Sequence, residues 1–320
     1  MNYDIFNGDA DGIIALIQLR LNEPKQAKLV SGVKRDNSLL KHVDIAQAKS
    51  VVALDISMEK NTEALNAILA NDIDVFYCDH HRTGDVPVSE KLTVLVDTAP
   101  EVCTSLLING LLDNKYIEWA IAAAYGDNLV SVADELALQQ GMTTPQREFL
   151  CELGTLINYN GYGASLADLH FNPAELYQAL LQYTNPFDVE ADKDSAFYIL
   201  RRGYQADHQN VAKLAPYINN DVCEIYLLPC EAWARRISGV FGNELANFHP
   251  DKAHAVLTLN TDGSYMVSVR APLNNRSGAD EVCVQFETGG GRKAAAGINR
   301  LPEHEINQLV DVLMQQYKHF

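Results

Sequence analysis

The stretch "YDIFNGDADGIIALIQLRL" (residues 3–21) joins a short apolar run to a helix-like pattern through an acidic turn that contains two glycines. Further apolar runs follow at residues 28–33, 51–56, 74–78 and 92–97. An amphipathic segment lies between the runs at 51–56 and 74–78. Strands that alternate with helices are typical of a parallel sheet. The sequence therefore predicts an α/β fold, with a mainly parallel sheet covered by helices on both faces.

The chain is long enough for two domains, with 320 residues of which 47% are hydrophobic. Residues 101–183 have an almost wholly helical pattern, and the charged, proline-broken stretch after them marks a boundary. We predict a first domain at 1–188, a linker helix at 189–212, and a smaller α/β domain at 213–320. The strands expected in the smaller domain lie at residues 223–229, 254–260 and 265–271.

The charge of the chain limits its partners. The formal net charge is −17, whereas long nucleic acid is bound mainly by an excess of Lys and Arg. Residues 213–320 hold 10 basic and 12 acidic side chains, and residues 1–212 hold 15 basic and 30 acidic ones. We therefore expect no long nucleic acid as a partner, and we expect any anion-binding patch in the second domain.

Two further classes are excluded by pattern. The six cysteines include no Cys-x-x-Cys pair, so neither a zinc knuckle nor a disulfide framework is indicated. No apolar run approaches the roughly 18 residues of a membrane span, and the N-terminus has no signal-peptide pattern. The expectation is a soluble, cytoplasmic protein without a membrane partner.

Acidic residues and two histidines follow the predicted strands. In open α/β sheets, ligands bind outside the carboxyl ends of the strands. We interpret Asp9 and Asp11 as lying in extended backbone, where residues two apart project to the same side. The full set is Asp9, Asp11, Asp55, Asp79, His80, His81 and, after a run of small residues, Asp127.

Taken singly, each aspartate is more simply a helix cap or a turn residue. Together they form a cluster of carboxylates that must be neutralised by cations. Oxygen ligands with an imidazole suit manganese or magnesium. Two such ions about 3.5–4 Å apart would serve displacement at phosphorus, so the pattern predicts a two-metal site.

Five motifs resemble, in order, those of the DHH phosphoesterase superfamily. They are "GDADG" (8–12), "ALDIS" (53–57), "CDHHR" (78–82), "YGDN" (125–128) and "TGGGRKAAAG" (288–297), the last preceded by the arginine-bearing "YMVSVRA" (265–271). The last pair is similar to the DHH-associated C-terminal domain. The superfamily includes RecJ-like exonucleases, NrnA-type nanoRNases, cyclic dinucleotide phosphodiesterases and manganese-dependent pyrophosphatases.

The resemblance implies roles for the clustered residues. Two divalent cations, manganese or alternatively magnesium, would be bound, and Asp55 would bridge them. Asp9 would complete the first site, and the second would be completed by Asp11, His80 and Asp127. His81 would donate to the scissile phosphate, Asp79 would orient it, and a water activated by the metals would be the nucleophile. The sequence departs from the family pattern at Asn7, where many members carry a histidine or an acid.

The glycine run of the second domain is interpreted as a substrate clamp. Backbone N–H groups of Gly289, Gly290 and Gly291 would approach an anion closely, and arginine can grip a phosphate with two donors. Arg270 and Arg292 are the arginines expected to do so, with Arg292 where the family often has histidine. For Lys293 and Arg300, a role as solvent-facing surface residues explains their presence as well as substrate binding does.

The function expected from the resemblance is metal-dependent hydrolysis of short linear oligonucleotides, 5′-phosphorylated diribonucleotides such as pGpG first, to nucleoside 5′-monophosphates. A RecJ-like single-strand exonuclease and a cyclic dinucleotide phosphodiesterase are the alternatives. A non-catalytic nucleotide sensor, suggested by Asn7, and a pyrophosphatase rank below them. The sequence leaves the base preference, the general acid and the oligomeric state open, with a homodimer as one option.

Overall fold

A computed structural model describes residues 1–318, so the last two residues of the expected second domain lie outside it. The chain divides into two compact units, Met1–Gly203 and Tyr204–Phe320. The division falls inside helix α9 (Ala196–Val211), in the region predicted to link the two domains. Across residues 1–318, no helix is both long and apolar enough to cross a membrane.

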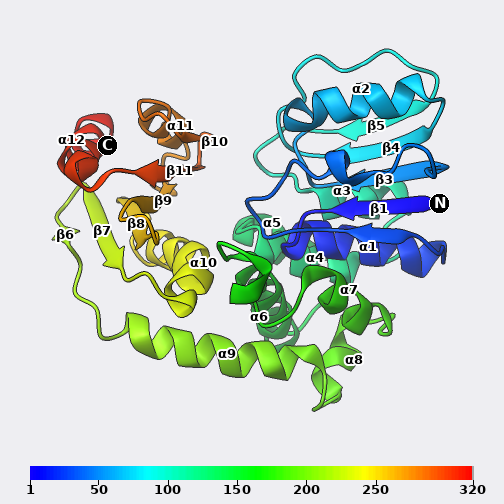
Figure 1. Cartoon of the computed structure of the whole chain (residues 1–320). Helices are drawn as coiled ribbons and strands as arrows, with labels where there is room; N and C mark the ends of the chain where they lie inside the picture. Colours follow the sequence, from blue (N-terminus) through cyan, green and yellow to red (C-terminus); the bar gives the residue numbers. More distant parts are fainter. Residues whose placement is uncertain (319–320) are drawn as a thin grey trace. The chain divides into compact units, whose positions relative to one another are not determined.

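The first unit contains a parallel sheet (Figure 1). The strand order is β2-β1-β3-β4-β5, and every neighbouring pair is parallel. The predicted α/β fold is thus confirmed. The strands are β1 (Asn2–Phe6), β2 (Lys28–Val30), β3 (Ser50–Leu54), β4 (Asp74–Asp79) and β5 (Leu92–Val96).

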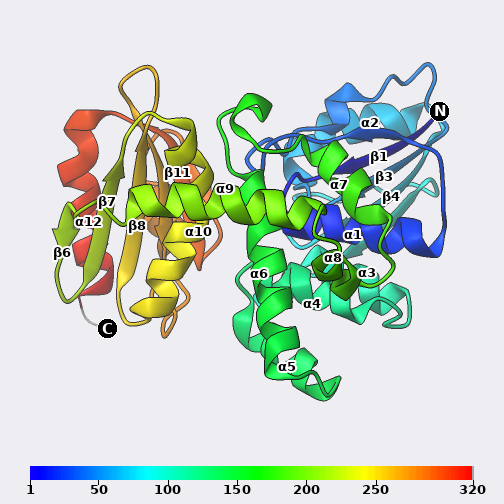
Figure 2. The same cartoon turned by 90° about the horizontal axis from the view of Figure 1, so that it is seen from below.

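Helices cover both faces of this sheet, with α1 (Ala10–Asn22) and α2 (Thr62–Ala70) on opposite sides (Figure 2). Alternation along the strands sends one set of apolar side chains toward α2, where Leu65 and Ile68 pack on them. The strand residues of this core include Tyr3, Ile5, Val51, Ala53, Val75 and Tyr77. On the other face, buried Arg20 of α1 pairs with Asp4 of β1.

The predicted helical region after the sheet is present. Its helices pack on α1 and on one another, and they complete the first unit. They are α3 (Thr104–Leu111), α4 (Ile117–Gly126), α5 (Val130–Gln139), α6 (Thr144–Gly161), α7 (Pro173–Leu181) and α8 (Pro186–Ala191). Short 3-10 helices lie at η1 (Leu40–His42), η2 (Glu59–Asn61) and η3 (Leu166–Asp168).

The second unit is a mixed sheet with helices on both faces. The strand order is β10-β11-β9-β8-β7-β6, and only β7 and β8 are parallel among its described pairs. Apolar residues of α11 and α12 pack on one face, while α10 contacts β8 and β9 from the other. The strands are β6 (Ile218–Asn219), β7 (Cys223–Leu228), β8 (Ala253–Leu259), β9 (Tyr265–Arg270), β10 (Gly289–Gly291) and β11 (Ala295–Leu301). The helices are α10 (Ala232–Phe248), α11 (Ala279–Cys283), η4 (Glu303–Glu305) and α12 (Ile306–Tyr317).

Candidate metal centre

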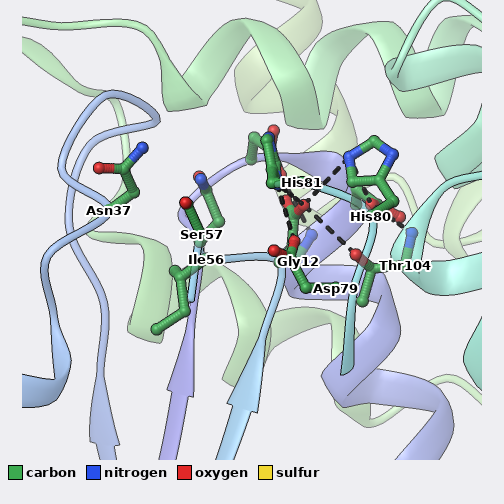
Figure 3. Close-up of polar contacts among 12 residues, drawn as sticks. Gly12, Asn37, Ile56, Ser57, Asp79, His80, His81 and Thr104 are labelled. Atoms are coloured by element: carbon green, nitrogen blue, oxygen red, sulfur yellow. Dashed lines mark hydrogen bonds and ion pairs between the residues drawn. The ribbon is translucent and has the colours of Figure 1, made fainter. Parts of the chain in front are cut away.

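The residues singled out in the first unit gather at the carboxyl ends of its strands. Asp55 comes directly after β3, while Asp79 ends β4 and is followed by His80 and His81. Figure 3 shows the side chains of Asp79, His80, His81 and Thr104 turned toward one another above these strand ends. The parallel sheet brings them together because its strands all end at the same edge.

Asp9 and Asp11 reach this cluster by a route that differs from the extended backbone we expected. Asp9 is the N-cap of α1, and its Oδ1 accepts from the Gly12 amide at 3.1 Å. Asp9 itself has extended backbone, but Asp11 lies in the first turn of the helix, so the expectation that both lie in extended backbone was wrong for Asp11. The helix begins as early as Ala10 because the Asp9 side chain satisfies one of its free N–H groups.

Asp11 is fixed by the start of α3. Its two carboxylate oxygens accept from the backbone N–H groups of Thr104 and Ser105, each at 2.7 Å. Burial raises its pKa above the ordinary value, and the carboxylates of Asp127 and Asp9 act in the same direction. The N-terminus of α3 therefore positions the Asp11 carboxylate, but it does not fully offset the cost of burying that negative charge.

Asp55 is a buried carboxyl group surrounded by other carboxylates of the cluster. Its φ of 56° lies in the left-handed region, which ends β3 one residue before the aspartate. Thr104 Oγ1 donates to Asp55 Oδ1 at 3.3 Å. Burial raises the pKa of Asp55 well above its usual value, and the neighbouring carboxylates raise it further. A cation at this position would remove that penalty.

His80 has the tautomer that a metal ligand requires. Its Nδ1 lies 2.8 Å from the carbonyl oxygen of Val102, which can only accept, so Nδ1 carries the proton of the neutral ring. Its Nε2 is left with a lone pair directed into the cluster. The distances from Nε2 are 3.4 Å to Asp55 Oδ1, 3.8 Å to Asp11 Oδ2 and 3.9 Å to Asp127 Oδ2.

These separations fit a shared ion. Ligand atoms about 2.1 Å from an octahedral cation lie about 3.0 Å apart when adjacent and about 4.2 Å apart when opposite. All three distances from His80 Nε2 lie between these limits. Within residues 1–318, ligand atoms of Asp55, His80 and His81 all lie within 4.8 Å of one another, and Asp11 and Asp127 also face His80 Nε2. This cluster could therefore hold a divalent ion such as manganese or magnesium.

Asp127 reaches the cluster because small residues allow α4 to approach α1 and α6. A Cβ atom on Gly126 would lie 2.5 Å from the Ala10 Cβ, and one on Gly154 would lie 1.9 Å from the Ala122 carbonyl oxygen. Neither side chain could be accommodated without backbone movement. Asp127 is the next residue after α4, so this close packing delivers its carboxylate to the site.

His81 and Asp79 form a pair beside the cluster. His81 Nδ1 lies 2.7 Å from Asp79 Oδ1, and the Asp79 side chain is completely buried. The His81 side chain is 28% exposed, so its ring is accessible to a ligand. The carboxylate holds the ring in one orientation and leaves Nε2 for other partners.

Lys34 is a site residue that the sequence reasoning missed. Its Nζ lies 2.6 Å from Asp9 Oδ2 and 2.9 Å from Asn158 Oδ1, a second residue that was missed. Burial alone would lower its pKa, but the Asp9 carboxylate raises it. At Asp9, therefore, an ammonium group stands where the resemblance places a divalent ion.

A signal for Lys34 was present in the sequence. We expected a strand over 28–33, but β2 ends at Val30, because it pairs with β1 only as far as Ile5. Lys34 thus follows a strand at the same sheet edge as Asp55 and His80. We selected the aspartates because they follow predicted strands. The same criterion would have selected Lys34 if basic side chains had been included.

The glycine run of the second unit is a β-strand. Gly289–Gly291 forms β10 at the edge of the sheet and pairs with β11. A Cβ on Gly289 would lie 1.7 Å from the Cys283 carbonyl oxygen, which explains the glycine by packing. An edge strand still has backbone groups on its outer side that no strand pairs.

The two predicted arginines have different surroundings. Arg270 is half-buried, and its guanidinium donates to Asn243 Oδ1 at 2.6 Å and to the carbonyl oxygens of Val269 and Gly239, each at 3.2 Å. These bonds use three of its five N–H donors. The side chain of Arg292 is exposed at the end of β10. Arg270 therefore stabilises the unit and retains two donors, while Arg292 is on the surface.

Comparisons with solved structures identify the fold. Exonuclease RecJ bound to manganese superimposes with a TM-score of 0.61 at 15% identity, over 100% of this chain and 90% of that one. RecJ from Thermus thermophilus in complex with Mn2+ gives 0.59 at 17% identity, over 100% of this chain and 52% of that one. The pGpG-specific phosphodiesterase PggH from Vibrio cholerae gives 0.55 at 11% identity, over 100% and 99%.

The sequence matches no protein-family model and no curated protein. Each of the three superpositions covers 100% of this chain, although the sequence identities are low. The chain has the fold of the DHH phosphoesterases, as its motifs indicated.

Proposed function

We propose that this protein is a divalent-cation-dependent phosphodiesterase that hydrolyses short linear oligonucleotides to nucleoside 5′-monophosphates. The observation that supports this most directly is the set of carboxylates around His80 Nε2, at distances that suit one shared ion. The resemblance predicts two ions. The geometry around His80 supports one of them, whereas Asp9 is paired with Lys34.

The residues have distinct tasks in this proposal. Asp11, Asp55, Asp127 and His80 would hold the cation, which when bound would supply a Lewis acid and a water of lowered pKa. His81 would donate from Nε2 to a phosphate oxygen. Asp79 accepts from Nδ1 of the same ring, which holds the ring in one orientation for that donation.

The second unit would bind the nucleotide part of the substrate. Arg292, the free donors of Arg270 and the outer side of Gly289–Gly291 are the groups suited to a phosphate. Their basic character contrasts with the acidic first 212 residues. A 5′-phosphorylated dinucleotide such as pGpG offers a terminal phosphate for this grip and an internal phosphodiester for hydrolysis.

One comparison and the charge of the chain favour a short substrate. The pGpG-specific phosphodiesterase PggH superimposes over 100% of this chain, with a TM-score of 0.55. The net charge of −17 also opposes binding of a long polyanion. A RecJ-like exonuclease is the second candidate, because RecJ gives the higher TM-score of 0.61.

A substrate panel tests the proposal. Purified protein with Mn2+ or Mg2+ is incubated with pGpG, pApA, cyclic di-GMP, 5-mer RNA and 20-mer single-stranded DNA, and products are separated by chromatography. We expect mononucleotide release from a dinucleotide, with kcat/KM falling as the substrate lengthens. An Asp55→Asn protein purified in parallel controls for contaminating nucleases.

The alternatives give different results in the same panel. Equal rates on 20-mer DNA would establish the exonuclease instead. A linear dinucleotide that accumulates from the cyclic one would indicate a cyclic dinucleotide phosphodiesterase. Tight nucleotide binding in calorimetry with no turnover of any substrate would identify a sensor.

A further inference from the structure

Lys34 places a positive charge inside the carboxylate cluster. Its Nζ contacts Asp9 Oδ2 at 2.6 Å and Asn158 Oδ1 at 2.9 Å, and it lies 3.8 Å from Asp127 Oδ1. The ring of Tyr162 lies beneath it, with its centroid 5.5 Å from Nζ. The side chain is only 22% exposed, so the ammonium belongs to the interior of the site.

The backbone of Lys34 is held on both sides. Its N–H donates to the Gly161 carbonyl at 2.7 Å, and its own carbonyl accepts from Asn7 Nδ2 at 3.1 Å. Asn7 thus anchors Lys34, while its own Oδ1 is buried and has no hydrogen-bond partner within residues 1–318. This departure from the DHH pattern is therefore coupled to the lysine.

Close packing joins the three segments involved. A Cβ on Gly8 would lie 2.0 Å from the Gly32 carbonyl oxygen, and one on Gly161 would lie 3.0 Å from the Gly8 carbonyl oxygen. The loop that carries Lys34, the turn before Asp9 and the end of α6 are thus in direct contact. The fixed backbone directs the lysine side chain toward Asp9.

Each carboxylate oxygen of Asp9 already has a partner, and one of these partners is a cation. One oxygen accepts from the Gly12 amide, and the other is paired with the Lys34 ammonium. A cation bound to that oxygen would lie about 2.1 Å from it. The ammonium nitrogen is 2.6 Å from the same atom, so it stands at the place of a cation bound by Asp9.

We propose that Lys34 is a built-in cation of the site: its ammonium stands in for one of two divalent ions, and the chain binds a single divalent ion at His80. The inference rests on the metal dependence proposed above but not on the choice of oligonucleotide. Asp9 and Asn158 use two of the three ammonium donors. The third is available for a phosphate oxygen, so Lys34 would also be a substrate contact.

Metal counting tests the proposal without any measurement of activity. Mn2+ bound per chain is determined by equilibrium dialysis with elemental analysis, in the absence of nucleotide. Electron paramagnetic resonance of the same samples distinguishes one isolated Mn2+ ion, with a six-line spectrum, from an exchange-coupled pair. We expect one Mn2+ per wild-type chain and the six-line spectrum.

A matched pair of variants tests the role of the ammonium. Lys34→Met keeps an unbranched side chain, one heavy atom shorter, and removes the charge; this variant is expected to bind two Mn2+ ions with a coupled spectrum. Lys41→Met, at an exposed lysine of the same unit, is expected to bind one like the wild type. Circular dichroism establishes that both variants fold.

Three outcomes would overturn the inference. Two coupled ions in the wild type would do so and would leave the proposed function standing. A single ion in folded Lys34→Met would show that the lysine does not limit the site. No bound Mn2+ in the wild type would contradict both the inference and the proposed metal dependence. The wild-type count stands by itself if Lys34→Met fails to fold.

Discussion

His81 Nδ1 lies 2.7 Å from Oδ1 of Asp79, a carboxylate with no exposed surface. An ionised carboxylate cannot donate, so the proton between the two atoms belongs to the histidine. Nε2 of the neutral ring would then be an acceptor. Donation to a phosphate therefore requires a proton on Nε2 as well.

Replacement of Asp79 by Asn tests this pair. The amide removes the charge of the carboxylate, and its NH2 group can donate to Nδ1 where the carboxylate can only accept. We expect kcat for the preferred dinucleotide to fall about 10–100-fold, as for outer partners of catalytic histidines, with little change in bound Mn2+. Steady-state kinetics together with 15N NMR of the histidine ring checks both parts. An unchanged kcat with an altered ring tautomer would contradict the role given to His81.

Replacement of Asp55 by Asn is expected to affect stability and metal binding in opposite directions. A carboxyl group whose pKa is raised by folding binds its proton more tightly in the folded state. Its contribution to stability is present below the ordinary pKa near 3.8 and is lost as the pH rises through the raised value. The metal-free wild type therefore loses stability from acid toward neutral pH through this group.

Asn at position 55 has no charge to bury, so the metal-free variant should melt above the metal-free wild type at pH 7. A gain of 1 kcal/mol corresponds to about 2–4 °C for a unit of this size. Mutation of a residue that contacts only the metal ligands typically lowers metal affinity about 10–100-fold. Mn2+ affinity should fall by more than this in Asp55→Asn, because Asp55 would bind the ion directly. Thermal unfolding at pH 4 and pH 7, with and without Mn2+, measures both effects. A lower melting temperature of the metal-free variant at pH 7 would refute the electrostatic account of Asp55.

Arg292 is predicted to bind the substrate without touching the metal centre. Arg292→Met should raise KM for a 5′-phosphorylated dinucleotide about 10-fold or more, because a hydrogen bond to a charged group contributes about 1.5–3 kcal/mol. Bound Mn2+ should not change. Arg202→Met, at an exposed arginine of α9, is the matched control and should leave KM unchanged. A fall in kcat at constant KM would exclude a binding role for Arg292.

Adjacent glycines of β10 should respond differently to alanine. The Cβ of Gly289→Ala would collide with the Cys283 carbonyl oxygen at 1.7 Å, and the strand must shift to relieve it. We expect a loss of about 1–3 kcal/mol, as for overpacked cores. Gly290→Ala has no atom within 4 Å of the new Cβ and should unfold like the wild type. Denaturant unfolding of both proteins provides the comparison, and equal losses would contradict the packing explanation.

Much of the fold could be predicted from local pattern. Alternating apolar runs located all the strands of the first sheet, because a buried parallel strand is apolar over its whole length. The ends were less accurate. The run at 51–56 continues through Asp55 and Ile56, but the positive φ of Asp55 ends the strand at Leu54. Such a backbone conformation is fixed by surrounding contacts, so it cannot be predicted from the hydropathy of the sequence.

The glycine run illustrates a different limit. Three glycines in sequence allow both a loop and a strand, and the run by itself does not choose between them. Pairing with β11 and the close approach of Cys283 select the strand. Both partners lie outside the run itself, and nothing in its composition points to them.

By itself, the sequence determined the parallel sheet and the residues that follow its strands. Side-chain polarity and the order of the strands along the chain can both be read directly from it. Only the tertiary structure decided which of those residues meet. It put the backbone N–H of Thr104 on Asp11, the carbonyl of Val102 on His80 and the ammonium of Lys34 on Asp9. Each contact joins segments at least 22 residues apart. Such distant approaches depend on how helices pack on the sheet, and they set the tautomer, the charge balance and the number of cations that the site can hold.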